Sequence, residues 1–164
     1  MTILLKNKHT LQVKDFYFKC SIGKKGVSNK KREGDKKTPK GIFGLGNLYY
    51  RKDRIKKPKT ILKCIEISKN MGWCDDINEP NKYNKLIKIK KNIKCEKLRR
   101  SNRQYDLLIP IKYNFDYPKV GLGSCIFIHL TKDYKSTAGC IALKKKDFLI
   151  MLRLIDKKTK IKIC

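Results

Sequence analysis

The chain has 164 residues, of which 40% are hydrophobic, so we expect one folded domain over residues 1–164 and exclude a disordered chain. The formal net charge of +28 comes from 42 basic and 14 acidic residues, and the basic residues are mostly Lys. Because recognition of phosphates and base edges favours Arg, which occurs only seven times, we do not expect a specific nucleic-acid partner.

The predicted elements of the first half are strands separated by polar loops. Two short strands around an Asn-Lys turn are expected in residues 2–23, followed by a loop over 24–40 that Gly26, Gly34 and Pro39 interrupt. Strands are expected again at 41–50 and 60–68, on either side of a charged connector at 51–59. Residues 71–86 carry turn-forming residues throughout and predict a structured loop.

The second half ends with the one helix that the hydrophobic pattern predicts. Residues 88–103 are weakly amphipathic and suggest at most a helical turn, whereas 105–114 and 124–130 are strongly strand-like. Apolar residues recur at helical spacing over 144–159, and a last strand is expected in KIKIC at the end of the chain. The pattern predicts a mainly β fold, a sandwich or barrel-like sheet of short strands with one main helix near the C-terminus.

The seven cysteines do not form a recognisable metal or disulfide pattern. Their number is odd, their spacings are irregular and no Cys-x-x-Cys pair occurs, so we expect neither a metal site nor a full disulfide framework. Most of them are expected to be small reduced core residues.

His129 and Cys140 form the combination that indicates chemistry. An apolar strand ends near His129, a polar loop follows, and Cys140 opens a second apolar run directly after Gly139, which predicts a hairpin-like unit with adjacent strands. A thiol with a pKa of about 8.5 is mostly protonated at neutral pH, and a neighbouring imidazole can take its proton. Gly139 allows a sharp turn, so that peptide N–H groups of residues 139 and 140 could bind an oxyanion. Asp133 or a backbone carbonyl could orient the imidazole, and the sequence does not decide between them.

The segment IFIHL…STAGCIAL resembles the active-site signature of the L,D-transpeptidase catalytic domain (the YkuD-type family), in which a His precedes a Ser/Thr-x-Gly-Cys motif. His129, Thr137, Gly139, Cys140 and Ile141 match this motif. Upstream, REGDKKTPKGIF and GWCDD…YN resemble further family segments, so the similarity covers the chain from about residue 22. Ala138 and Ala142 stand where many members have His and Arg.

The resemblance implies an all-β enzyme that acts on peptidoglycan stem peptides without a metal or other cofactor. Cys140 would attack the carbonyl on the L-centre of the third residue and expel the terminal D-alanine, leaving a thioester. A neighbouring stem would then give a 3→3 crosslink, or water would give carboxypeptidase activity. His129 would be the general base and then the acid, and Thr137 would support the turn or bind substrate.

A second group of candidates lies in the segment 73–84. Asp75 and Asp76 could attract the ammonium group of a stem peptide, or could simply initiate turns. Trp73, Tyr83 and Asn84 could line the same pocket.

Two other functions stay open at this point: a basic module that binds a polyanion or nucleic acid with a structural Cys140, and a cysteine hydrolase of another amide. The Lys-rich segments 51–59 and 85–100 could also dock on anionic wall polymers. The substrate implies the cell envelope, although no signal peptide or transmembrane segment is evident and a cytoplasmic location is an alternative. The oligomeric state is not predicted.

Overall fold

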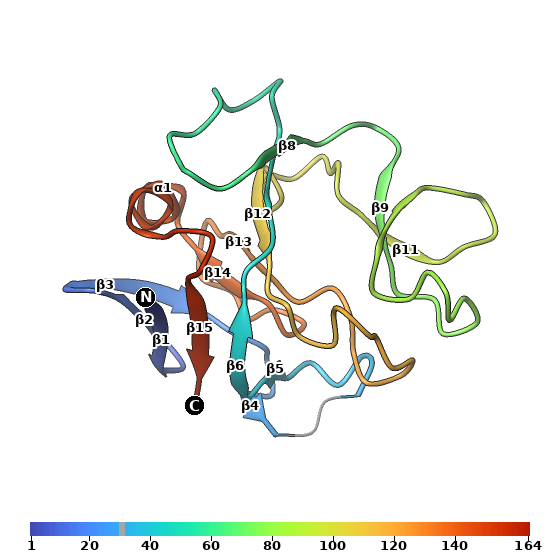
Figure 1. The fold of residues 1–164 in the computed structure, drawn as a ribbon, viewed down its shortest axis with the longest axis horizontal. Helices are drawn as coiled ribbons and strands as arrows, with labels where there is room; N and C mark the ends of the chain where they lie inside the picture. Colours follow the sequence, from blue (N-terminus) through green and yellow to red (C-terminus); the bar gives the residue numbers. More distant parts are fainter. Residues whose placement is uncertain (30–31) are drawn as a thin grey trace.

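The computed structural model describes residues 1–29 and 32–164, and over these residues the chain forms fifteen strands and one helix (Figure 1). The predicted mainly β fold with a single main helix near the C-terminus is confirmed. Part of the loop expected at 24–40, residues 30–31, lies outside the described residues.

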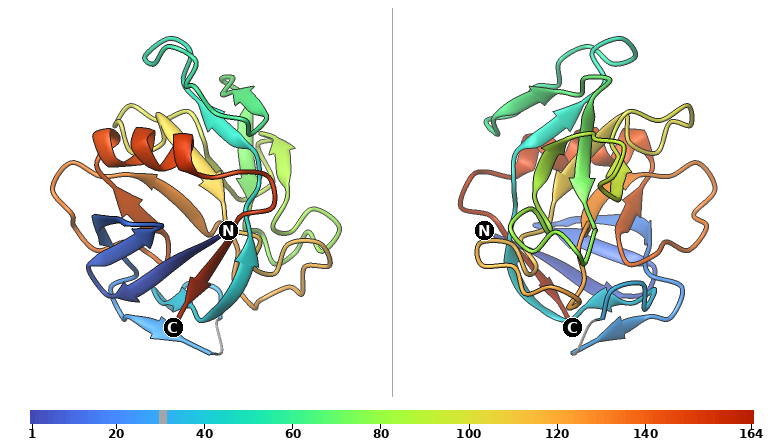
Figure 2. Two further views of the ribbon diagram at one scale, coloured as in Figure 1. Left: turned by 60° about the vertical axis from the view of Figure 1, so that its left-hand side comes forward. Right: turned by 90° about the vertical axis from the view of Figure 1, so that its right-hand side faces the viewer.

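Ten strands build one long, curled sheet that spans the molecule (Figures 1 and 2). In spatial order they are β6 (Gly41–Gly44), β15 (Lys160–Ile163), β1 (Thr2–Asn7), β2 (Thr10–Val13), β3 (Phe16–Ser21), β14 (Ile141–Leu143), β13 (Phe127–Leu130), β12 (Leu107–Pro110), β7 (Leu48–Tyr50) and β8 (Cys64–Glu66). The two smaller sheets are β10 (Leu86–Lys88), β9 (Met71–Cys74) and β11 (Cys95–Lys97) in that order, and the pair β4 (Val27–Ser28) and β5 (Thr38–Pro39).

The long sheet has a different core on each face around β13. Because side chains alternate along a strand, Ile128 and Leu130 join the main core, whereas Phe127 and His129 point to the opposite face. On that opposite face a smaller cluster contains Phe127, Cys140 and aromatic residues such as Trp73 and Tyr105. The candidate residues His129 and Cys140 therefore lie on the face of the sheet away from the main core.

Helix α1 (Lys145–Leu154) lies within the predicted range 144–159 and covers the main core. Its buried side chains Phe148, Met151 and Leu152 follow helical spacing, and burial of each contributes about 1.5–3 kcal/mol. The helix ends at Ile155, where the backbone becomes extended. The three views show α1 on one side of the long sheet and β9 and β11 on the other (Figures 1 and 2).

The N-terminal segment holds three strands where two were predicted. Besides the expected turn after Asn7, a second turn occurs at Lys14, whose φ of 52° is uncommon for a residue with a side chain. That turn divides β2 from β3. Lys14 gave no sequence signal for it, because Gly, Asn and Asp are the usual residues at positive φ.

The segment from 71 to 103 differs from the prediction in its strands. The structured loop expected at 71–86 contains β9, and the helical turn expected in 88–103 is wrong, because residues 95–97 form β11 and pair with β9. Hydrogen bonding to β9 determines this conformation, and a weak amphipathic pattern in the local sequence cannot reveal that partner. Within the described residues, no helix is both long and apolar enough to cross a bilayer.

Candidate active site

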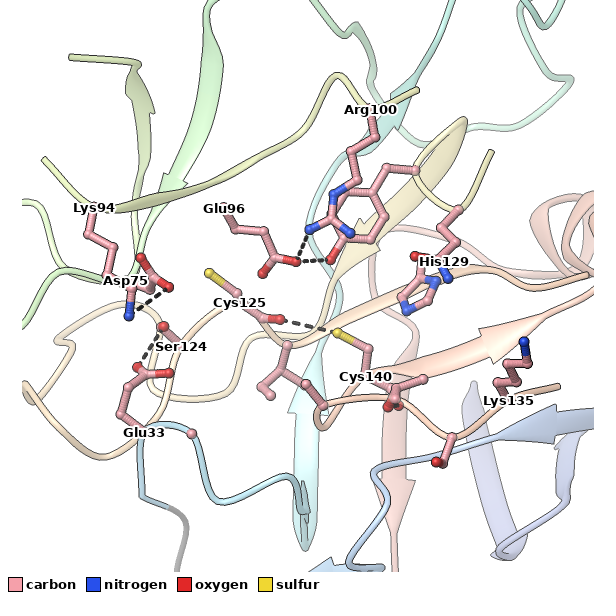
Figure 3. A pocket seen from close by; sticks show the side chains of 17 residues that line it. Glu33, Asp75, Lys94, Glu96, Arg100, Ser124, Cys125, His129, Lys135 and Cys140 are labelled. Carbon is pink, nitrogen blue, oxygen red and sulfur yellow. Dashed lines mark hydrogen bonds and ion pairs between the residues drawn. The ribbon is translucent and has the colours of Figure 1, made fainter. Parts of the chain in front are cut away.

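A cavity of about 630 Å³ opens on the face of the long sheet that carries His129 and Cys140 (Figure 3). Its lining comes from the β4–β5 loop, the three-stranded sheet, the segment 124–126 and the connection that leads to β14. The lining residues that the following paragraphs use are Glu33, Asp75, Lys94, Glu96, Arg100, Tyr105, Cys125, His129, Thr137 and Cys140.

The strands that carry the pair are adjacent, as predicted, but they are parallel and do not form a hairpin. Ile128 faces Ile141 and His129 faces Ala142, while Cys140 immediately precedes β14. The connection from residue 131 to 140 therefore runs back along the sheet, so that both strands start at the same end. Cys140 and Ala142 share a face with His129, and the small Ala142 side chain leaves room between the thiol and the imidazole.

A backbone carbonyl orients His129. The Nδ1 atom is 2.9 Å from the carbonyl oxygen of Leu130, and since a carbonyl only accepts, Nδ1 carries the hydrogen. In neutral imidazole the lone pair then belongs to Nε2, which Figure 3 shows on the side of Cys140. Asp133, the other candidate for this role, forms an ion pair with Lys135 at 3.3 Å.

Burial keeps this imidazole neutral. Only 6% of His129 is exposed, and burial lowers its pKa from 6.5 to about 4, to which the positive charge of Arg100 also contributes. The hydrogen bond to Leu130 acts in the opposite direction. At neutral pH His129 can therefore accept a proton but has none to give up from Nε2.

The Cys140 thiol is held at the floor of the cavity by two backbone groups. Its S–H donates to the carbonyl oxygen of Cys125 at 3.2 Å, and the N–H of Phe127 donates to Sγ at 3.4 Å. Residue 140 is 7% exposed, and the exposed part faces the cavity. These contacts fix the sulfur on the same side of the sheet as the imidazole (Figure 3).

The turn before Cys140 is built by Thr137 and Gly139. The Thr137 hydroxyl donates to the Cys140 carbonyl at 2.6 Å and accepts from the N–H of Gly139 at 3.1 Å. Gly139 has φ = 140°, a conformation that side-chain-bearing residues rarely adopt. The backbone of Thr137 also bonds to Ile22 and Lys24 beyond the end of β3, which ties the turn to the N-terminal part of the sheet.

Trp73, Tyr83 and Asn84 lie buried behind the cavity wall rather than along its surface. The side-chain oxygen of Asn84 accepts hydrogen bonds from Trp73 Nε1 at 3.0 Å and from the N–H of Cys125 at 3.1 Å. Tyr83 donates to Glu33 and accepts from the N–H of Gly123. These residues position the segment whose carbonyl, at Cys125, holds the thiol.

The neighbouring aspartates Asp75 and Asp76 differ in their surroundings. Asp75 lines the cavity, its Oδ1 is buried without a hydrogen-bond partner among the described residues, and burial raises its pKa. Lys94 lies 3.7 Å from its other oxygen. Asp76 instead accepts from the N–H groups of Asn78 and Lys94, which is the turn-forming alternative.

Three residues that the sequence analysis did not single out lie beside the pair. Tyr105 packs its ring against His129 with centroids 5.3 Å apart, and its hydroxyl donates to Glu96. Arg100 bonds Glu96 at 2.6 Å and lies 4.1 Å over the Tyr105 ring. The sequence signal for an ion pair between Glu96 and Arg100 was their i,i+4 spacing, but that spacing is typical of a helix. The fold, and not the local sequence, brings both residues near His129.

The described residues include no group of three or more His, Cys, Asp or Glu side chains arranged to hold a metal ion. The groups present are a thiol, a neutral imidazole and charged side chains of both signs. This set suits acyl transfer to a thiol from a substrate that carries its own charges.

The structure thus places a His–Cys pair in an open cavity of a curled, mainly β domain. The family model of the L,D-transpeptidase catalytic domain matches residues 1–163, and the chain belongs to that family. The match extends the similarity seen in the motifs to the N-terminal strands. No curated protein and no solved structure matches the chain. As a member of this family, the protein has an L,D-transpeptidase-type activity directed at peptidoglycan.

Proposed function

We propose that Cys140 is the nucleophile of an acyltransferase that takes the acyl group of a peptidoglycan stem peptide as a thioester. The observation that carries this proposal is the anchoring of His129: Nδ1–H is bound to Leu130, so Nε2 is the basic atom beside the thiol. The whole chain, residues 1–164, would then be one catalytic domain.

In the acylation step, Nε2 of His129 takes the proton of the Cys140 thiol as the sulfur attacks the carbonyl carbon of the third stem residue. The C–S bond forms, and the carbonyl oxygen becomes an oxyanion. The imidazolium then gives its proton to the nitrogen of the terminal D-alanine as the C–N bond breaks. A thioester on Cys140 and free D-alanine are the products.

The turn at 139–140 is the proposed place of the oxyanion. A donor aimed at such an oxyanion contributes about 3 kcal/mol to catalysis. The Gly139 N–H bonds to the Thr137 hydroxyl, so it can join the oxyanion only when that bond opens. Cys140 N–H is the second proposed donor.

The second half-reaction follows the same path in reverse. An amine of a neighbouring stem gives a proton to Nε2 while its nitrogen attacks the thioester, and the Cys140 thiolate leaves and is reprotonated. The product is a 3→3 crosslink. When water attacks instead, the outcome is an L,D-carboxypeptidase reaction.

Asp75 is the proposed contact for an ammonium group of the stem peptide. Its buried Oδ1 has no hydrogen-bond partner among the described residues, and its other oxygen forms an ion pair with Lys94 at 3.7 Å. Because an unpaired buried carboxylate oxygen costs free energy, a cationic ligand at this position would be stabilised. Asp76 is not part of this proposal, since its oxygens already accept backbone N–H groups.

The proposed site of action is the cell envelope, where the stem peptides that the family uses are found. The strongly positive charge of the chain supports contact with anionic wall polymers.

The test is mass spectrometry of the intact protein after incubation with a tetrapeptide stem or a carbapenem. We expect a covalent adduct on Cys140 that is absent in Cys140→Ala. Cys125→Ala is the matched control, because it removes a cavity thiol but keeps the carbonyl that Cys140 bonds, and it should still form the adduct. An adduct on another cysteine would refute the assignment. Adding an amine acceptor then separates transfer from hydrolysis by the product formed.

A further inference from the structure

A second pair of thiols lies in the three-stranded sheet, and the proposed reaction does not use it. Cys74 is the last residue of β9 and Cys95 the first of β11, and the antiparallel register places them directly opposite each other. Cys74 is fully buried, Cys95 is partly exposed, and both are reduced in this structure.

The hydrogen bonds of β9 show which kind of cross-strand pair this is. The N–H of Cys74 donates to the carbonyl of Lys85 at 2.9 Å, and the carbonyl of Cys74 accepts from the N–H of Asn84 at 2.8 Å. Both groups therefore point to the β10 side of β9, away from β11. The carbonyl of Met71, three residues earlier, instead accepts from the N–H of Leu98, the residue that follows β11. Cys74 and Cys95 therefore form a non-hydrogen-bonded pair, the kind in which opposite Cα atoms approach to about 4.5 Å. That separation is within the range of roughly 4.4–6.8 Å that a disulfide spans.

The Cys95 sulfur lies on the same face of the sheet as Cys74. An ideal Cβ placed on Gly72 would be only 2.7 Å from Cys95 Sγ, so the sulfur rests over the bare backbone of Gly72. Gly72 and Cys74 share a face, because they are two residues apart on one strand. Rotation about the Cα–Cβ bond of Cys95 would thus carry its sulfur from Gly72 toward Cys74.

We propose that Cys74 and Cys95 are a modification site, a dithiol that a small disulfide of the glutathione-disulfide type converts into a cross-strand disulfide. The more exposed Cys95 reacts first: its thiolate attacks one sulfur of the oxidant and expels a glutathione thiolate. The Cys74 thiolate then attacks Cys95 Sγ in the mixed disulfide and expels the second. The two protons lost by the cysteines are taken up by the two glutathione thiolates, so the oxidant is reduced by two electrons.

The bond would act on the wall of the cavity. Asp75 follows Cys74, and Lys94 and Glu96 flank Cys95, and these three side chains line the cavity. A covalent link between the strands would hold them at one separation. Burial raises the pKa of both thiols, which makes the exchange slow near neutral pH and faster in alkaline buffer.

The experiment is oxidation of the purified protein with glutathione disulfide, followed by denaturing alkylation and tryptic digestion without reductant. We expect the peptide 70–82, which holds Cys74, to be linked to the peptide 95–97, and the link to disappear after reduction. The oxidised protein should also melt at a higher temperature than the reduced one. None of these readouts depends on catalysis, so they are separate from the test of Cys140.

Cys74→Ser and Cys95→Ser should each lose the linked peptide, whereas Cys64→Ser, which removes a partly buried thiol of another strand, should keep it. Cys95→Ser is the safer of the two for folding, because Cys74 is fully buried. Recovery of both cysteines alkylated, glutathione on each without a link, or a link between other cysteines would overturn the proposal.

Discussion

The residues proposed to do the chemistry were predictable to the extent that they are close in sequence. His129, Thr137, Gly139 and Cys140 lie within twelve positions, and the spacing itself indicates a base, a turn and a thiol. For the group that orients His129 the sequence offered Asp133 or a backbone carbonyl, and it could not decide between them because a backbone carbonyl has no residue type; the structure shows the carbonyl of Leu130. Tyr105, Glu96 and Arg100 were not predictable, because the fold brings them to His129 from another segment.

Burial of His129 predicts an unusual pH profile. Its pKa of about 4 lies below the ordinary 6.5, so Nε2 should stay available as a base down to about pH 4. The acid limb of the acylation rate constant for a carbapenem should therefore fall near pH 4, with near-UV circular dichroism showing that the protein is still folded. Between pH 6.5 and 4 the unfolded chain binds a proton that the folded chain does not, so stability should decrease as the pH falls through this window. An acid limb near pH 6.5 would contradict the buried, neutral imidazole.

Asp75→Asn tests the proposed ammonium contact, because it keeps nearly the same side-chain shape and removes the negative charge. Loss of a charge-assisted hydrogen bond of about 1.5–3 kcal/mol should raise KM for a stem peptide by roughly 10- to 100-fold. Acylation by a carbapenem without a cationic group should change little. Asp76→Asn, the control, should instead affect thermal stability, because its oxygens accept two backbone N–H groups. Equal KM values for wild type and Asp75→Asn would rule out the contact.

At the scale of elements, the strands at the site were predicted as adjacent but with the wrong direction. A polar connection between two apolar runs suggests a hairpin, whereas the parallel pairing of β13 with β14 shows that the connection runs back along the sheet. The same kind of distant pairing explains β11, which needs β9 as its partner. Local pattern thus predicted the strand positions near His129 and Cys140 better than their partners.

Thr137→Val tests the turn that presents Cys140. Valine keeps the shape but removes the hydroxyl that bonds both the Gly139 N–H and the Cys140 carbonyl. We expect acylation to slow by about 10-fold or more, in keeping with about 1–1.5 kcal/mol for each lost hydrogen bond, while Thr137→Ser restores it. The control is Thr131→Val, in the same connection, whose hydroxyl accepts only from Tyr134. Equal rates for the two valine variants would show that the turn does not depend on Thr137.

At the scale of the whole molecule, charge dominates the behaviour in solution. With 42 basic and 14 acidic residues, repulsion among like charges opposes the folded state over much of the surface. The cavity differs from this surface, since its lining holds as many acidic residues as basic ones: Glu33, Asp75 and Glu96 beside Lys94, Arg100 and Lys135. The sequence predicted the excess of charge but not this local concentration of acids, which come from three separate segments.

Salt should therefore stabilise the protein. Raising NaCl from low to high concentration screens the repulsion, so the melting temperature should increase. Binding to an anionic polymer should weaken steeply over the same range and should be equal in wild type and Cys140→Ala. A melting temperature that is constant or falls with added salt would contradict the argument from net charge.

The place of β15 in the sheet has a consequence for how the protein is made. This strand, which comes last in the chain, lies between β6 and β1 and pairs with both. Until residue 163 has left the ribosome, β1 and β6 each expose a row of unsatisfied peptide groups, and the main core lacks Ile161 and Ile163. Until β15 pairs, the chain therefore carries a gap beside the edge strand β6 of its largest sheet, and a chaperone that shields strand edges would act on it at that stage.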